Sequence, residues 1–185
     1  MQNDNLLDEK TLSENQIFNG KIINVHLDEV ALPNGKKANR EVVDHPGGVC
    51  IAALTDDNNL LFVKQYRYPY HEIILELPAG KLESGSTPLE NGIRELKEET
   101  GANGYGYTSL GKLYPSPGYV SEIIHLYFCR VDEFSTPNPD EDEFLEVIKI
   151  PLEEAVAMVL NNQIADSKTQ VAILKTKLLL ENGTL

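Results

Sequence analysis

The stretch Gly80–Gly101, GKLESGSTPLENGIRELKEETG, decides the fold, because it predicts a helix with two defined ends. Thr87 is a suitable N-cap residue, and Glu90, three residues later, would complete a capping box. Pro88 suits the first helical position. The last glycine of the stretch is placed to end the helix in a left-handed conformation. We therefore expect a helix over residues 88–99.

This helix would carry an acidic cluster near its C-terminal end. Glu95, Glu98 and Glu99 are one, three and four residues apart, so their carboxylates can converge on one side. The helix dipole disfavours anions at that end, and Arg94 can offset only part of the repulsion. The face turned to the core is predicted by residues at helical spacing, namely Leu89, Ile93, Leu96 and Thr100.

A hard cation with oxygen ligands would resolve this repulsion. Magnesium, with manganese as a second choice, binds carboxylates together with phosphate oxygens, which favours a phosphate-ester or pyrophosphate substrate. The alternative for any acid-rich helix is a solvated charged face that binds nothing.

The remaining sequence predicts an α/β or α+β sandwich, with a mixed sheet and helices on its faces. Residues 1–15 are polar and predict a short helix or arm, and residues 16–43 read as strands around a hairpin turn at residues 33–35. We place the main boundary at His45–Gly48, which gives an N-terminal β unit over residues 1–45 and a main domain over residues 46–185. Further strands are expected at residues 49–54, 60–65, 73–77, 105–113, 123–131 and 145–150, and helices at residues 152–160 and 167–180.

Composition excludes several classes of partner. The formal net charge of −13 argues against nucleic acid, which needs a basic surface. No apolar run is long enough to span a membrane, and the N-terminus does not resemble a secretory signal. Cys50 and Cys129 lie far apart in apolar runs, so we expect buried, reduced thiols in a cytoplasmic protein.

Two further groups of charged residues each allow a functional and a structural interpretation. Arg40 and Arg67 each lie in or beside an apolar strand, where an arginine binds a phosphate or forms a structural salt bridge. The acidic loop Pro139–Glu143 is either solvated or supplies a carboxylate that activates water.

The helix and its preceding loop resemble the Nudix signature. The matching positions are Gly80, Arg94, Glu95, Leu96, Glu98, Glu99, Gly101 and Ala102. One position departs from the pattern, because Ser86 stands where the family usually has a glutamate that helps to fix the loop against the arginine. Glu83 is nearby, and the spacing alone does not show whether it takes over that role.

The resemblance extends beyond the signature to bacterial ADP-ribose pyrophosphatases. The similar segments are residues 63–69, 76–80, 116–118 and 165–169. The resemblance implies a Nudix-type α/β/α sandwich that hydrolyses ADP-ribose with Mg²⁺ to AMP and ribose 5-phosphate. It also implies a homodimer formed through the N-terminal strands. The alternatives are another nucleoside diphosphate sugar, such as GDP-mannose, and a silent Nudix domain that senses a nucleotide.

The resemblance assigns roles to particular residues. The expected metal ligands are Ala79, Glu95, Glu98 and Glu99. The expected catalytic residues are Glu98, Glu141 and Glu143, with Glu141 favoured as the base and Glu143 as support for the metal. The expected substrate-binding residues are Arg40, Arg67, Lys81 and Pro117.

Overall fold

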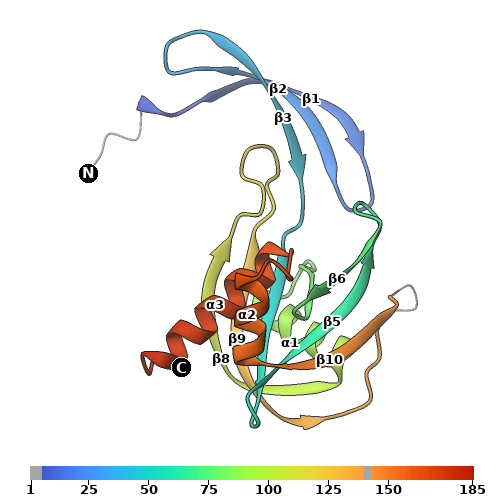
Figure 1. Cartoon of the computed structure of the whole chain (residues 1–185). Coiled ribbons are helices and arrows are strands. Elements are labelled where there is room, and N and C mark those ends of the chain that lie inside the picture. The colour runs from blue at the N-terminus through green and yellow to red at the C-terminus, as the bar shows by residue number, and fades with distance from the viewer. Residues whose placement is uncertain (1–5, 140–142) are drawn as a thin grey trace. The chain divides into compact units, whose positions relative to one another are not determined.

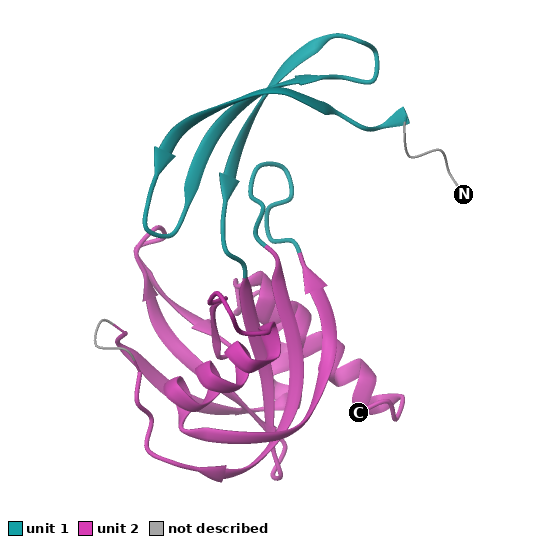
Figure 2. Ribbon diagram, turned by 180° about the vertical axis from the view of Figure 1, so that it is seen from behind, with its two compact units in different colours: residues 1–47, 114–122 teal, residues 48–113, 123–185 magenta. Residues whose placement is uncertain are grey.

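The computed structural model describes residues 6–139 and 143–185, which form two compact units (Figure 2). The N-terminal unit comprises the described residues up to Gly47 together with Tyr114–Glu122. The main unit comprises Gly48–Leu113 and the described part of Ile123–Leu185. Among the described residues, no helix is long and apolar enough to cross a membrane.

The N-terminal unit is a three-stranded antiparallel sheet in the order β1-β2-β3. Its strands are β1 (Lys10–Asn19), β2 (Asn24–Ala31) and β3 (Lys37–Asp44). The small antiparallel unit expected from the sequence is therefore confirmed, and the turn at residues 33–35 joins β2 to β3. The expected helix or arm over residues 1–15 is wrong from Lys10 onward. Every residue of β1 is exposed, so the strand has no apolar alternation by which it could be recognised.

The main unit is a mixed sheet with helices on both faces, which confirms the expected sandwich (Figure 1). The five strands of its main path run in the order β10-β5-β4-β9-β8, and β4 pairs with β9 in parallel. The strands are β4 (Gly48–Thr55), β5 (Asn59–Arg67), β6 (Glu72–Glu76), β7 (Ala79–Lys81), β8 (Ala102–Leu113), β9 (Ile124–Phe134) and β10 (Leu145–Pro151). The helices are α1 (Pro88–Thr100), α2 (Leu152–Leu160) and α3 (Ser167–Glu181).

The β4–β5 hairpin is paired only at its turn, where Leu54 faces Leu60. Beyond that point β5 pairs with β6, and β4 pairs with β7. The hairpin therefore opens and admits the short segment β6–β7. This opening places β7, which leads into the loop before α1, inside the sheet.

Two apolar cores lie on opposite faces of this sheet. The core under α1 contains Ile51, Leu96 and Cys129, and the core under α2 and α3 contains Cys50 and Phe62. Both cysteines are buried free thiols, as expected, and the two belong to different cores.

The buried face of α1 differs from the predicted stripe. Leu96 and Thr100 are buried as expected, but the side chain of Ile93 is exposed and Glu99 is buried. The cause is Gly92, because a Cβ there would lie 2.6 Å from Cδ1 of Ile51. Without a side chain at this position the helix packs directly on β4, and the glutamates that share this face turn toward the sheet.

The end of α1 gives a test of this packing. Gly101 has a φ of 72°, and a Cβ there would lie 2.0 Å from the carbonyl oxygen of Ser135. The left-handed conformation alone costs an alanine about 1–2 kcal/mol, and the clash adds to that. We expect Gly101→Ala to lower the free energy of unfolding in urea by more than this amount. Gly85→Ala is the matched control, because Gly85 has a φ of 91° and open space around it. Equal losses in both variants would contradict the proposed clash.

Candidate active site

The ends of α1 are fixed by the residues that the sequence indicated. The side chain of Thr87 accepts a hydrogen bond from the Glu90 amide, and the Glu90 carboxylate accepts one from the Thr87 amide at 2.7 Å. At the other end, the amide of Gly101 donates to the carbonyl of Lys97. The helix therefore begins and ends at defined positions, and this fixes where along the sheet its acidic residues lie.

The three glutamates of the cluster differ in burial. Glu99 is buried, and its Oε2 accepts a hydrogen bond of 3.1 Å from the amide of Ala79 in β7. The side chain of Glu95 is largely covered, and that of Glu98 is one-third exposed. A Cβ at Gly80 would lie 2.0 Å from the carboxyl carbon of Glu95, so the glycine makes room for that carboxylate.

Arg94 binds three carboxylates at once. Its guanidinium donates to Glu98 at 2.6 Å and to Glu95 at 2.8 Å. It also forms an ion pair of 3.1 Å with Glu83, from the loop before α1. Glu83 therefore supplies the contact between loop and arginine that Ser86 cannot make. Its position, three residues before Ser86, was the only sign of this in the sequence.

Burial and mutual repulsion disfavour the charged forms of Glu95 and Glu99. Burial, followed by the charge of Glu95, raises the pKa of Glu99 to about 8. Burial also raises the pKa of Glu95, and the charge of Arg94 opposes that rise. Glu143 contributes to both shifts, so the described end of the acidic loop lies close enough to act on them electrostatically.

This donor set fits a hard divalent cation. The ligands on offer are carboxylate oxygens, and one of them is buried with an amide as its partner. Within the described residues, the oxygens of Glu95, Glu98 and Glu99 do not all lie within 4.8 Å of one another. Arg94 binds two of the three, so a cation would compete with its guanidinium for Glu95 and Glu98.

A second charged network lies beside the acids, on β5, β6 and α3. Arg67 donates to both carboxylate oxygens of Glu76, at 2.5 and 2.8 Å, and Lys168 also donates to Glu76. Lys168 reaches Asp166 at 3.0 Å, and the Asp166 side chain caps α3. Glu76 and Lys168 are almost fully covered, whereas the side chain of Arg67 remains 39% exposed. The buried Glu76 thus holds Arg67 in place through hydrogen bonds, while part of the Arg67 side chain stays exposed.

The other predicted residues are distributed over both units. Arg40 belongs to the N-terminal unit and forms a two-bond ion pair with Glu9. Pro117 also belongs to that unit, and Lys81 ends β7 with an exposed side chain. Glu141 lies outside the described residues.

The sequence matches two known domains in succession. Residues 9–43 match the nucleoside diphosphate sugar hydrolase N-terminal domain, and residues 44–171 match the NUDIX domain. The chain belongs to the Nudix family. The acidic helix and the loop before it, which resemble the Nudix signature, lie within this match, and we refer to them as the Nudix motif.

Similar proteins cover nearly the full chain. An ADP-ribose pyrophosphatase of Bacillus subtilis is 43% identical over 90% of this chain and 91% of its own. A protein of Bacillus methanolicus named methanol dehydrogenase activator is 42% identical over 91% and 92%. A solved structure titled as an ADP compounds hydrolase shares the fold, with a TM-score of 0.84 over 97% and 98% of the two chains at 21% identity.

The buried network around Glu76 predicts a strong effect of Lys168. Lys168→Met leaves the buried carboxylate with Arg67 alone, so we expect a loss of about 2–4 kcal/mol in the free energy of unfolding. Lys177→Met is the matched control, because Lys177 on the same helix pairs with the exposed Glu153. Urea unfolding of both variants measures the difference, and a comparable loss in the two would contradict the structural role of the buried pair.

Proposed function

We propose that this protein hydrolyses the pyrophosphate bond of ADP-ribose with Mg²⁺, releasing AMP and ribose 5-phosphate. The observation that carries the proposal is the set of Glu95, Glu98 and Glu99 on one helix, with Glu99 buried against β7. The near full-length similarity to an ADP-ribose pyrophosphatase supports the choice of substrate. The two buried free cysteines support a cytoplasmic setting.

In this proposal the three glutamates and the carbonyl of Ala79 hold Mg²⁺, with Mn²⁺ as a second choice. When bound, the metal would neutralise phosphate oxygens and lower the pKa of a bound water. The protein's own part is to keep the carboxylates in place. Arg94 orients Glu95 and Glu98, and the Ala79 amide orients Glu99.

The loop after β9 supplies the base in this proposal. We favour Glu141 as the group that takes the proton from water and Glu143 as support for the metal. The electrostatic effect of Glu143 on Glu95 and Glu99 supports a loop that acts at this helix. In this proposal Glu95, Glu98 and Glu99 bind the cation, so a carboxylate outside the helix is needed for proton transfer.

Substrate binding falls to Arg67, Lys81, Arg40 and Pro117 in this proposal. Arg67 offers a guanidinium whose position is fixed by the Glu76–Lys168 pair, and its exposed side faces solvent, where it can meet a phosphate. Arg40 would have to exchange Glu9 for the substrate. We assign residues 46–185 to the catalytic domain and residues 1–45 to a unit that completes the substrate site.

We further propose a homodimer through the N-terminal strands. A small sheet is stable when its apolar side chains are covered, and this one exposes Ile17, Phe18 and Ile22 to solvent by 49–60%. Light scattering should report a dimer for the wild type and a monomer for Phe18→Asp. The control is Leu160→Asp in α2, also exposed, which should stay dimeric.

The substrate is tested by a panel of nucleoside diphosphate sugars, with phosphate release measured after phosphatase treatment. We expect ADP-ribose to be turned over fastest, and Glu98→Gln to lower the rate at least about 100-fold while the fold is retained. Faster turnover of GDP-mannose would replace the proposed substrate. If no member of the panel is turned over in a metal-dependent way, the nucleotide-sensing alternative is favoured. One relative is named as an activator of another enzyme, which is the reason to test this alternative.

The loop assignment is tested by three variants. Loss of the base should lower kcat by about 100-fold or more with little effect on KM, so we expect this of Glu141→Gln. Glu143→Gln should instead raise the Mg²⁺ concentration needed for half-maximal rate. Glu146→Gln is the control, because its exposed side chain pairs with Lys64 on the neighbouring strand. A larger loss of kcat in Glu143→Gln than in Glu141→Gln would reverse the two roles.

A further inference from the structure

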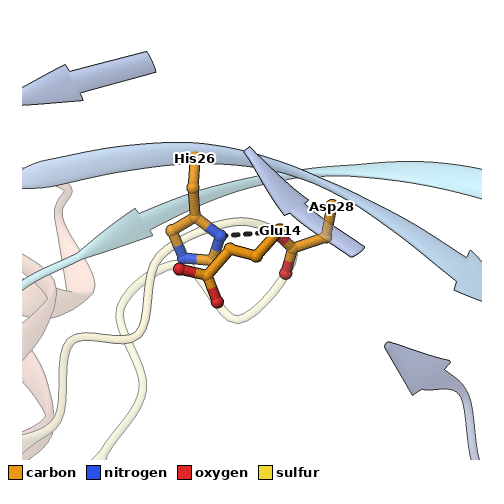
Figure 3. Close-up of side chains that lie close together, drawn as sticks. All are labelled: Glu14, His26 and Asp28. Carbon is orange, nitrogen blue, oxygen red and sulfur yellow. Dashed lines mark hydrogen bonds and ion pairs between the residues drawn. The ribbon is translucent and has the colours of Figure 1, made fainter. Parts of the chain in front are cut away.

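A cluster of one histidine and three carboxylates lies in the N-terminal unit, outside the Nudix motif. His26 and Asp28 alternate on one face of β2, and both are buried. Glu14 of β1 stands directly opposite Asp28 in the strand register. Figure 3 shows Glu14 extending from β1 across the His26–Asp28 pair. Asp44, at the end of β3, completes the group.

These side chains lie close enough together to hold a cation. Nδ1 of His26 lies 2.7 Å from Oδ1 of Asp28, and Nε2 lies 3.4 Å from Oδ2 of Asp44. Glu14, His26 and Asp28 each place one ligand atom within 4.8 Å of the other two. Within the described part of the chain, no other trio of histidine, cysteine or acidic side chains meets this condition.

The negative charge of the cluster exceeds what His26 can neutralise. Even a charged imidazole would balance only one of the three carboxylates of Glu14, Asp28 and Asp44. Arg40 stands opposite Asp28 in the register of β3, but its guanidinium is bound to Glu9 at 2.8 Å.

Two irregularities in β1 bracket the acidic ligand. The register with β2 shifts between Thr11 and Ser13 and again between Gln16 and Phe18. Glu14 thus lies in the short regular stretch between the shifts. Irregularities of this kind re-aim side chains and are frequent beside binding sites. β1 buries none of its residues, so a ligand bridging Glu14 to β2 would add an attachment that apolar packing does not give.

We propose that Glu14, His26 and Asp28 bind a transition-metal dication such as Zn²⁺, at a site separate from the Nudix motif. An imidazole nitrogen combined with carboxylates suits Zn²⁺ or Co²⁺, whereas Mg²⁺ prefers oxygen ligands alone. Asp44 at the other ring nitrogen is the outer carboxylate that orients a metal-bound histidine. The ion clamps the edge strand β1 onto β2, next to the Glu9–Arg40 pair.

Co²⁺ is the probe that separates this site from the Nudix motif. The full chain is freed of metal with a chelator and titrated with Co²⁺ in a large excess of Mg²⁺, while the intense visible absorption of four-coordinate Co²⁺ reports binding. We expect one absorbing Co²⁺ per chain, displaced by Zn²⁺. His26→Gln should abolish the signal, and Asp44→Asn should weaken binding at least about ten-fold.

The controls make each outcome decisive. Glu99→Gln lies in the Nudix helix, and His45→Gln removes a histidine whose Nδ1 lies 3.4 Å from Oε1 of Glu122. Both variants should keep the Co²⁺ signal. If His26→Gln does not fold, Glu14→Gln on the exposed strand decides, and it should weaken binding at least about ten-fold. No absorbing Co²⁺ in the wild type would overturn the proposal. A signal lost in Glu99→Gln, or unchanged in both His26→Gln and Glu14→Gln, would also overturn it.

Discussion

The close approach of α1 to the strands beneath it is the constraint on which the site depends. Gly92 lets the helix pack on β4, and Gly80 leaves room for the carboxylate of Glu95. The face that would otherwise carry apolar side chains therefore carries Glu95 and Glu99, and the buried Glu99 accepts a hydrogen bond from the Ala79 amide. Burial of that carboxylate raises its pKa to about 8. The fold thus favours the binding of a positive charge beside this helix.

In the main unit, basic side chains hold acidic side chains in position through ion pairs, and the acidic side chains hold the basic ones in turn. Arg94 joins the loop to the helix through Glu83, Glu95 and Glu98. Arg67 rests on Glu76, which Lys168 holds from α3. In a chain with a net charge of −13, these two cations are positioned by bidentate or multiple contacts. A bound divalent cation would offset the carboxylate charge that Arg94 leaves unbalanced.

The sequence predicted α1, its capping box and its glycine end, because those signals are local. The sandwich was also predicted from the sequence, because apolar residues recur at different spacings in strands and in helices. The buried face of α1 was not predicted correctly, because the decisive residue, Gly92, has no side chain and acts through a neighbouring strand. The ion pair of Glu83 and the cluster around His26 depend on contacts across loops and strands that spacing does not encode. The first part of β1, residues 10–15, was missed because a fully exposed strand carries no alternation.

In the proposed function, the helix of Glu95, Glu98 and Glu99 carries the site at which a pyrophosphate bond is cleaved. The most direct test incubates ADP-ribose with the protein and Mg²⁺ and separates the products by chromatography. We expect AMP and ribose 5-phosphate in equal amounts from the wild type, and neither product from Glu99→Gln. Release of ADP and ribose, or the same products at the same rate from Glu99→Gln, would contradict it.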